Sequence, residues 1–416
     1  MAVRVFLQTF GCRANQYDSE AVAAMVSAGG GVLVDVAEDA DVAIFNSCAV
    51  TAAAEADLRQ QVRRTARVAP SVRTVVMGCA AARSASVIAA LPTVSAVVPG
   101  ADLTAIGEAI GLAPSAGITA GAMQRGTRGL LRIQDGCDEH CTFCATTLAR
   151  GANRSRSIDA LVCEAEQLSA HHPEIVLTGI HIGTYGADCG SSLGELLEAL
   201  VRRVRGVRFR LSSVEATEVD ARLAELLTGA ATRVAPFLHA PLQSGSDAVL
   251  RRMGRHWYTA RQYADAIEAL IARTAVFGLG ADLICGFPGE TDADHAATCA
   301  LVRALPFSAL HVFPYSPRPG TPAVRLSGTV PDGTRRARAA ELRAIGAERA
   351  AAHVIRRVGG TADVIVIGEE DGTRAGLTED YLSVDFLGVP PARGARIAAT
   401  LQAGRDPRRP IAIPIA

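Results

Sequence analysis

Three cysteines lie close together in the run Gly-Cys-Asp-Glu-His-Cys-Thr-Phe-Cys, at Cys137, Cys141 and Cys144. Three thiolates on one short loop can bind three irons of a 4Fe-4S cluster, and no fourth cysteine follows at ferredoxin spacing. One iron would then be open to a ligand that is not protein, where chemistry can occur. The alternative is a zinc site completed by His140, although zinc sites usually present their cysteines as spaced pairs.

Another three cysteines each follow a short β-rich run in the N-terminal region. They are Cys12, Cys48 and Cys79, which come just after the strands expected at residues 3–9, 42–46 and 74–77. Because the carboxyl ends of parallel strands share one edge of an open sheet, these cysteines should converge there. The alternative is that they are small buried residues, as free cysteines often are. Buried cysteines would lie inside strands, so their position beyond the strand ends favours a second metal site.

The elements that position these cysteines predict an α/β protein of three regions. Residues 1–122 alternate strands with helices at 15–28 and 52–69, which indicates an open α/β sheet. Residues 123–345 repeat a strand-then-helix unit, which predicts a partial (β/α)6 barrel with an open side. Its strands are expected at residues 129–133, 174–177, 208–212, 236–239, 279–284 and 309–313.

In such a barrel, functional residues gather at the carboxyl ends of the strands. The cysteine loop follows the first strand, and polar or glycine positions follow the others: Gly179, Ser213, Glu215 and Gln243 among them. Ordinary turns use the same residue types, so these positions alone do not establish a site.

After the barrel, residues 331–357 predict an arginine-rich linker helix, for which a solvated face is the usual explanation. Residues 346–416 include expected strands at 362–367, 382–386 and 395–401, which indicate a small C-terminal β-domain.

Composition limits the possible functions. The net charge of the 416-residue chain is zero, so any surface for nucleic acid must be local. Neither a signal peptide nor a membrane span is recognisable, which predicts a cytoplasmic protein without a membrane partner. In a reducing cytosol, 10 cysteines favour metal binding over disulfides. The chain contains no lysine, which excludes a P-loop lysine and a Schiff-base lysine.

The cysteine loop on the first strand of a partial barrel resembles the radical S-adenosylmethionine enzymes. The two sets of cysteines together resemble the two-cluster layout of the methylthiotransferases, and the C-terminal β-domain resembles their RNA-binding TRAM module. Further similar blocks are Arg-Gly at 150–151, Arg-Ser-Arg at 154–156, Pro-Leu-Gln-Ser-Gly-Ser at 241–246, Gly-Phe-Pro-Gly-Glu at 286–290 and Tyr-Ser-Pro-Arg-Pro-Gly-Thr-Pro at 315–322. One departure is Ala-Thr-Thr at 145–147, where the family usually has two aliphatic residues and a proline.

Residues 46–51, residues 177–183 and the block at 315–322 are most similar to the branch that acts on threonylcarbamoyladenosine at position 37 of tRNA. The branches that act on isopentenyladenosine in tRNA, or on a ribosomal-protein aspartate, remain alternatives. A non-catalytic iron–sulfur sensor that binds RNA is another, although it would not need a polar rim around an open iron.

The resemblance implies roles for the residues above. Cys137, Cys141 and Cys144 would bind one 4Fe-4S cluster, whose open iron holds S-adenosyl-L-methionine. Cys12, Cys48 and Cys79 would bind a second 4Fe-4S cluster, which supplies the methylated sulfur. No catalytic residue is implied beyond the clusters. Candidate contacts to S-adenosyl-L-methionine are Phe143, Gly179, Ser213, Glu215 and Gln243.

The implied partners are tRNA, an electron donor such as flavodoxin or ferredoxin, and a sulfur source. Because tRNA is a polyanion, docking on a neutral chain needs a local basic surface. The predicted surface is the linker helix, and the alternatives are the C-terminal β-domain and the segment with Arg150, Arg154 and Arg156. The linker arginines are Arg335, Arg336, Arg338 and Arg343, with Arg356 and Arg357 beyond them.

Overall fold

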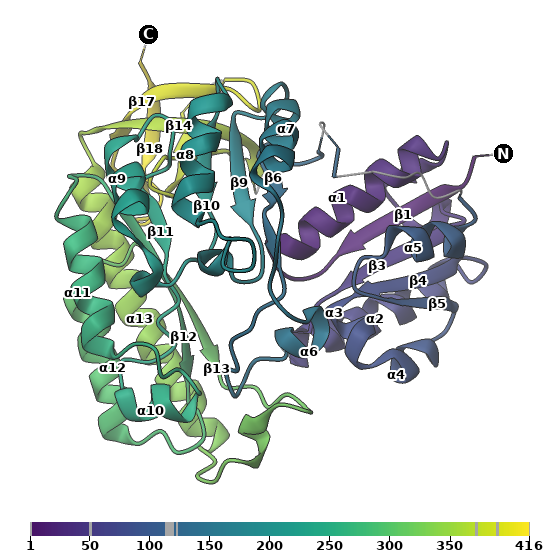
Figure 1. The fold of residues 1–416 in the computed structure, drawn as a ribbon, viewed down its shortest axis with the longest axis horizontal. Coiled ribbons are helices and arrows are strands. Elements are labelled where there is room, and N and C mark those ends of the chain that lie inside the picture. The colour runs from purple at the N-terminus through teal and green to yellow at the C-terminus, as the bar shows by residue number, and fades with distance from the viewer. Residues whose placement is uncertain are drawn as a thin grey trace.

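The structure is a computed structural model that describes residues 2–49, 52–112, 120–121, 124–370, 373–387 and 391–415. Figure 1 shows an N-terminal sheet in purple and blue beside a larger barrel in teal and green, with the C-terminal strands in yellow at one end of that barrel. None of the helices in these ranges is both long and apolar enough to cross a membrane.

The N-terminal region is an open parallel sheet in the order β2-β1-β3-β4-β5. Helix α1 (Arg13–Ala28) and helix α5 (Leu103–Ile110) cover one face, and α2 (Ala52–Val68) covers the other. The central strand is buried along its whole length, which explains its continuous apolar run. The strands are β1 (Arg4–Thr9), β2 (Val32–Val34), β3 (Val42–Ser47), β4 (Arg73–Gly78) and β5 (Val94–Pro99).

The middle region confirms the predicted partial barrel. Its parallel strands form two groups, β10-β9-β6 and β11-β12-β13, which isolated bridges join between β10 and β11. Within the described residues β6 and β13 each pair with one neighbour only, so the barrel is open between them (Figure 1). The strands are β6 (Gly129–Arg132), β9 (Glu174–Thr178), β10 (Arg208–Leu211), β11 (Phe237–His239), β12 (Gly278–Cys285) and β13 (Ala309–Pro314).

The outer helices of the barrel begin at side-chain caps. Ser192, Thr259 and Thr291 each form a capping box with the residue three positions later, which satisfies backbone N–H groups that a helix start leaves free. The helices are α7 (Ile158–Ser169), α8 (Leu193–Arg203), α9 (Ala221–Gly229), α11 (Ala260–Ile271), α12 (Asp292–Ala304) and α13 (Asp332–Arg357).

Helix α13 corrects the predicted linker. It is helical as expected, but Ala339, Leu342 and Ile345 belong to the barrel core, because the helix packs along β13. Arg338 is buried and forms ion pairs with Glu290 (2.7 Å) and Asp292 (2.6 Å). The predicted boundary at residue 346 falls inside this helix, and the one between residues 122 and 123 lies outside the described residues.

The C-terminal strands form a closed barrel in the order β14-β15-β16-β18-β17. The strands expected at residues 362–367, 382–386 and 395–401 correspond to β14, β16 and β17, whereas the sequence did not predict β15 and β18. The barrel covers the amino ends of the β10 and β11 strands: Arg208 donates to the Asp363 carbonyl at 2.9 Å, and the Tyr381 ring stacks on Phe237 at 4.6 Å. Its strands are β14 (Thr361–Glu370), β15 (Thr373–Leu377), β16 (Ser383–Phe386), β17 (Arg396–Gln402) and β18 (Ile411–Pro414).

Candidate metal centres

The cysteine loop after β6 is fixed at its base and at its middle. The short strands β7 (Gln134–Asp135) and β8 (Arg154–Ser155) pair across its base. In the middle, the Thr142 N–H donates to the Met253 carbonyl at 2.8 Å, and the Thr142 hydroxyl donates to the Arg252 carbonyl at 2.9 Å. The loop is therefore held against helix α10 (Asp247–Arg252).

A buried arginine faces Cys141. Arg255 Nη1 donates to Cys141 Sγ at 3.4 Å, and another nitrogen of the same guanidinium pairs with the Glu215 carboxylate. The Trp257 indole N–H also donates to Glu215. Burial raises the pKa of the Cys141 thiol to about 12, although Arg255 opposes that rise. The thiolate form therefore needs positive charge beside it. Arg255 supplies part of that charge, and a bound metal would supply the remainder.

A histidine faces Cys137 in a similar arrangement. His181 Nδ1 lies 3.5 Å from Cys137 Sγ, and His181 Nε2 lies 2.7 Å from Glu218 Oε1. Burial lowers the pKa of His181, but hydrogen bonds to Cys137 and Glu218 outweigh it and raise the pKa to about 10. The third sulfur, Cys144 Sγ, accepts the Thr146 backbone N–H at 3.3 Å. Each of the three sulfurs thus has a polar group at hydrogen-bond distance, whereas His140 is exposed.

Both carboxylates come from one turn after β10. Glu215 caps the 3-10 turn Ala216–Glu218, and the Glu215 N–H donates to Glu218 Oε2 at 3.1 Å. The Glu218 side chain fits against Gly183, where a Cβ would lie 1.7 Å from Oε2. The turn therefore fixes the two cations that face the sulfurs.

The N-terminal cysteines come together at one edge of the sheet, as the strand ends predicted. In the register of the sheet, Thr9 lies beside Asn46, which lies beside Met77, so β1, β3 and β4 end level with one another. Asn15 Oδ1 lies 3.7 Å from Cys12 Sγ and 3.9 Å from Cys79 Sγ.

Cys48 joins this group across Gly11. A Cβ at Gly11, whose φ is +103°, would lie 2.7 Å from Cys48 Sγ, so only glycine fits there. Two neighbours of Cys48 in the block at 46–51, Val50 and Thr51, lie outside the described residues.

Arg150 links the two groups of cysteines. It lies at the end of α6 (Thr146–Arg150), which contains two of the three residues that depart from the family pattern. Its Nε donates to Cys79 Sγ at 3.3 Å, and its Nη2 donates to Asn15 Oδ1 at 2.8 Å and Asp18 Oδ2 at 2.7 Å. Burial lowers the pKa of Arg150, but Asp18 and Cys79 outweigh it and raise the pKa.

The candidate cofactor contacts have different surroundings. Phe143 packs edge-on against Phe287, with ring centroids 6.4 Å apart. Ser213 is exposed at the rim. A Cβ at Gly179 would lie 2.7 Å from the Gln134 carbonyl, so packing within the protein already requires glycine there.

The other two candidate cofactor contacts, Gln243 and Glu215, are held in place by hydrogen bonds. Gln243 has a φ of +63° and is held by backbone hydrogen bonds to Asp282 and Ile284 at 2.8 and 2.9 Å. A left-handed conformation of a residue other than glycine costs about 1–3 kcal/mol and is often found at functional sites. Both oxygens of Glu215 already accept hydrogen bonds, from Arg255 and Trp257.

Sequence analysis did not single out the groups that surround the sulfurs. His181 lay inside the block at 177–183 without a role, and Arg255, Glu218 and Asn15 belonged to no motif. The available signal was position: His181 and Glu218 both follow the carboxyl ends of barrel strands.

Two family models match the chain. One, described as "Uncharacterized protein family UPF0004", matches residues 4–100, and the other, described as "Radical SAM superfamily", matches residues 131–302. They correspond to the N-terminal sheet and to most of the barrel.

Curated relatives match along nearly the whole chain. A protein of Bacillus subtilis named threonylcarbamoyladenosine tRNA methylthiotransferase MtaB is 34% identical, over 92% of this chain and 90% of its own. A protein of the same name from Thermotoga maritima is also 34% identical, over 92% and 91%. A tRNA-2-methylthio-N(6)-dimethylallyladenosine synthase of Cereibacter sphaeroides is 33% identical, over 91% and 93%.

Solved structures share the fold at low sequence identity. Two structures of the radical S-adenosylmethionine methyltransferase TsrM from Kitasatospora setae align with TM-scores of 0.56 and 0.58 at 15% identity. The alignments cover 76% and 78% of this chain, and 75% and 74% of TsrM. This similarity supports the fold alone.

Proposed function

The chain belongs to the radical S-adenosylmethionine methylthiotransferase family, and we propose that it adds a methylthio group to C2 of threonylcarbamoyladenosine at position 37 of tRNA. The assignment of the substrate rests on four relatives named for threonylcarbamoyladenosine, which match 92% of this chain at 30–34% identity. The second candidate substrate is dimethylallyladenosine, also called isopentenyladenosine, which the name of the Cereibacter sphaeroides relative favours.

The barrel cysteines fit one 4Fe-4S cluster. Cys137, Cys141 and Cys144 each have a polar group at hydrogen-bond distance from the sulfur, which would stabilise thiolate ligands. The cluster and S-adenosyl-L-methionine supply the radical chemistry when bound. Arg255 and His181 stabilise negative charge on the sulfurs, and Glu215 and Glu218 hold these two cations in position.

A second 4Fe-4S cluster on Cys12, Cys48 and Cys79 is part of the proposal. It is supported by Cys12 and Cys79 beside Asn15, by Cys48 across Gly11, and by the Arg150 guanidinium beside Cys79. In this role the chain would hold the sulfur that is transferred to the adenine.

Four residues remain proposed contacts to S-adenosyl-L-methionine: Phe143, Gly179, Ser213 and Gln243. Glu215 takes a different proposed role, because its oxygens are occupied by Arg255 and Trp257. We assign Glu215 as a positioning residue that acts on Cys141 through Arg255.

The proposed tRNA surface is a basic cleft between the N-terminal sheet, the barrel and the C-terminal strands. The cleft has a volume of about 500 Å³, and the cations that line it are Arg13, Arg125, Arg128 and Arg393, with Glu20 as the acidic residue. Arg13 directly follows Cys12, so phosphate binding here would bring RNA near the second set of cysteines. The C-terminal barrel would act as the TRAM-like part of this surface.

This cleft replaces the linker helix as the proposed docking surface. Arg338 is buried in ion pairs and cannot meet a phosphate, whereas four arginines come together along the cleft. The electron donor and the sulfur source stay predictions, and a tRNA substrate is consistent with a cytoplasmic location.

Mass spectrometry of tRNA nucleosides from a strain that lacks this protein tests the substrate. Loss of methylthio-threonylcarbamoyladenosine, restored by the wild-type gene but not by Cys141→Ala, is the expected result. If that nucleoside is unchanged while the methylthio-isopentenyl nucleoside disappears, the second candidate substrate is correct.

A further inference from the structure

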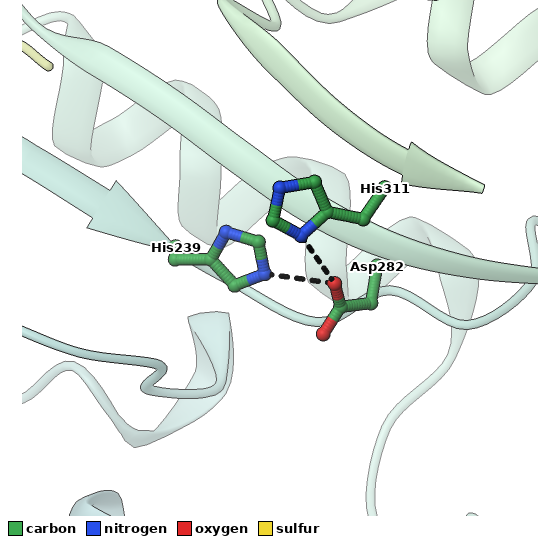
Figure 2. A group of neighbouring side chains, drawn as sticks. All are labelled: His239, Asp282 and His311. Atoms are coloured by element: carbon green, nitrogen blue, oxygen red, sulfur yellow. Dashed lines mark hydrogen bonds and ion pairs between the residues drawn. The ribbon is translucent and has the colours of Figure 1, made fainter. Parts of the chain in front are cut away.

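Three metal-binding side chains meet on the strands β11, β12 and β13, apart from the cysteines. His239 Nε2 lies 3.1 Å from Asp282 Oδ1, and His311 Nδ1 lies 3.2 Å from the same oxygen. Figure 2 shows the two imidazole rings directed at this one carboxylate oxygen. The three atoms all lie within 4.8 Å of one another.

The backbone holds these side chains on rigid elements. Asp282 and His311 are register partners on β12 and β13. The His239 carbonyl accepts the Val214 N–H at 3.0 Å, and the Asp282 carbonyl accepts the Gln243 N–H at 2.8 Å. A Cβ at Gly280 would lie 2.6 Å from His239 Nδ1, so the ring occupies space that only glycine leaves free.

These distances match the ligands of a single metal ion. Ligand atoms about 2.1 Å from an octahedral ion lie about 3 Å apart when adjacent, close to the 3.1 and 3.2 Å that separate the two imidazole nitrogens from Asp282 Oδ1. Two histidines and one carboxylate that occupy one face of an ion leave its other positions open. Side-chain exposure rises from 13% at His239 and 28% at Asp282 to 61% at His311, so the open positions would face solvent.

We propose that His239, Asp282 and His311 bind one divalent transition-metal ion of the zinc or ferrous-iron class, separate from both sets of cysteines. Imidazole nitrogen suits these ions, and the carboxylate adds negative charge. Backbone contacts connect the triad to Ser213 and Gln243, two of the proposed cofactor contacts, through the bridge of Ser213 with His239 and the Gln243 N–H. An ion there would present open positions to oxygen donors of a bound ligand at the same rim.

Zinc retention by the reconstituted, cluster-loaded protein tests this site. After anaerobic dialysis against micromolar zinc and then zinc-free buffer, the wild type should keep one zinc per chain that Asp282→Asn and His311→Gln lose. Iron content should be equal in all three. His311 is mostly exposed, so its variant keeps the fold, and a melting curve without zinc checks this.

Glu341→Gln is the matched control, because His295, Cys299 and Glu341 form a similar group on the outer helices α12 and α13. This variant should keep the zinc. The proposal fails if the wild type retains none, if both triad variants retain as much as the wild type, or if Glu341→Gln alone removes it.

X-ray absorption at the zinc edge gives a second readout. The expected first shell contains only nitrogen and oxygen, at about 2.0–2.1 Å, whereas sulfur at about 2.3 Å would put the ion on cysteines and refute the triad.

Discussion

The barrel and the N-terminal sheet each hold three cysteines, but the two sites are built in opposite ways. The barrel sulfurs come from one continuous loop, and the side chains that face them, His181 and Arg255, belong to the same barrel. The N-terminal sulfurs come from three strand ends, and those of Cys12 and Cys79 lie beside Asn15. The cation beside them, Arg150, is supplied by the barrel.

This difference indicates an unequal dependence between the two regions. The barrel site has its own cations and carboxylates, so it should keep its chemistry when the other site is lost. The N-terminal site takes its cation from the segment that follows the barrel cysteines. Substitutions in that segment of the barrel should therefore alter the N-terminal site.

The largest effect is expected from replacing Cys137, Cys141 and Cys144 together with Ala. Iron per chain should fall by half, and both 5′-deoxyadenosine and methylthiolated tRNA should fall to background, since the ligands of the proposed first cluster are gone. Iron analysis and chromatography of the products measure this. Retention of all the iron would contradict the two-site interpretation.

Replacing Cys12, Cys48 and Cys79 with Ala should halve the iron and abolish methylthiolation, but leave 5′-deoxyadenosine formation. The reason is that the barrel site keeps all of its own contacts. If a folded variant no longer cleaves S-adenosyl-L-methionine, the barrel site depends on the sheet and the comparison is wrong.

Arg150→Gln should lower methylthiolation by less than either triple cysteine replacement does. Removing a contact that supports a metal ligand typically costs about 10- to 100-fold in metal affinity or activity, so methylthiolation should fall by this factor. Cleavage of S-adenosyl-L-methionine without tRNA should change little.

Arg154→Gln is the control for this variant, because Arg154 lies on the same segment with 60% of its side chain exposed. Methylthiolation by the control should stay near wild type. Equal losses in both variants would mean that positive charge in the segment, and not the contact with Cys79, matters.

The smallest effect is expected from Arg125→Gln with Arg393→Gln in the basic cleft. Each arginine that binds a phosphate steepens the slope of log affinity against log salt by about 1, so the slope should flatten by about 2. Arg408→Gln, on the C-terminal barrel outside the cleft lining, is the control. An unchanged slope in the double variant would remove the cleft from the proposed docking surface.

What could be predicted from the sequence was local. The spacing of Cys137, Cys141 and Cys144 identifies a metal loop, and the runs before Cys12, Cys48 and Cys79 place those residues at strand ends. Arg255 lies 114 positions from Cys141, and Asn15 lies 64 from Cys79. Contacts between residues so far apart in sequence can be identified only when strand order and register are known, so the patterns of a single sequence could not reveal them.

Helix α13 has the predicted exposed arginines at Arg336, Arg343 and Arg356, but the burial of Arg338 was not predicted. Its arginines indicated a solvated linker, but Arg338 is buried because Glu290 and Asp292 pair with it. A charged residue can be expected on the surface only when no group of opposite charge pairs with it in the interior. Pairing groups that are distant in sequence cannot be recognised before the fold is known.

The contact of Arg150 with Cys79 also has a consequence for synthesis on the ribosome, where the chain emerges from its N-terminus. Arg150 lies 71 positions after Cys79, so the N-terminal sheet is synthesised well before the side chain that completes its cysteine group. A ribosome-bound chain that has exposed only the sheet lacks this cation. The proposed N-terminal cluster should therefore mature late, after the cysteine loop of the barrel has emerged, and the isolated sheet should retain iron less well than the same sheet in the full chain.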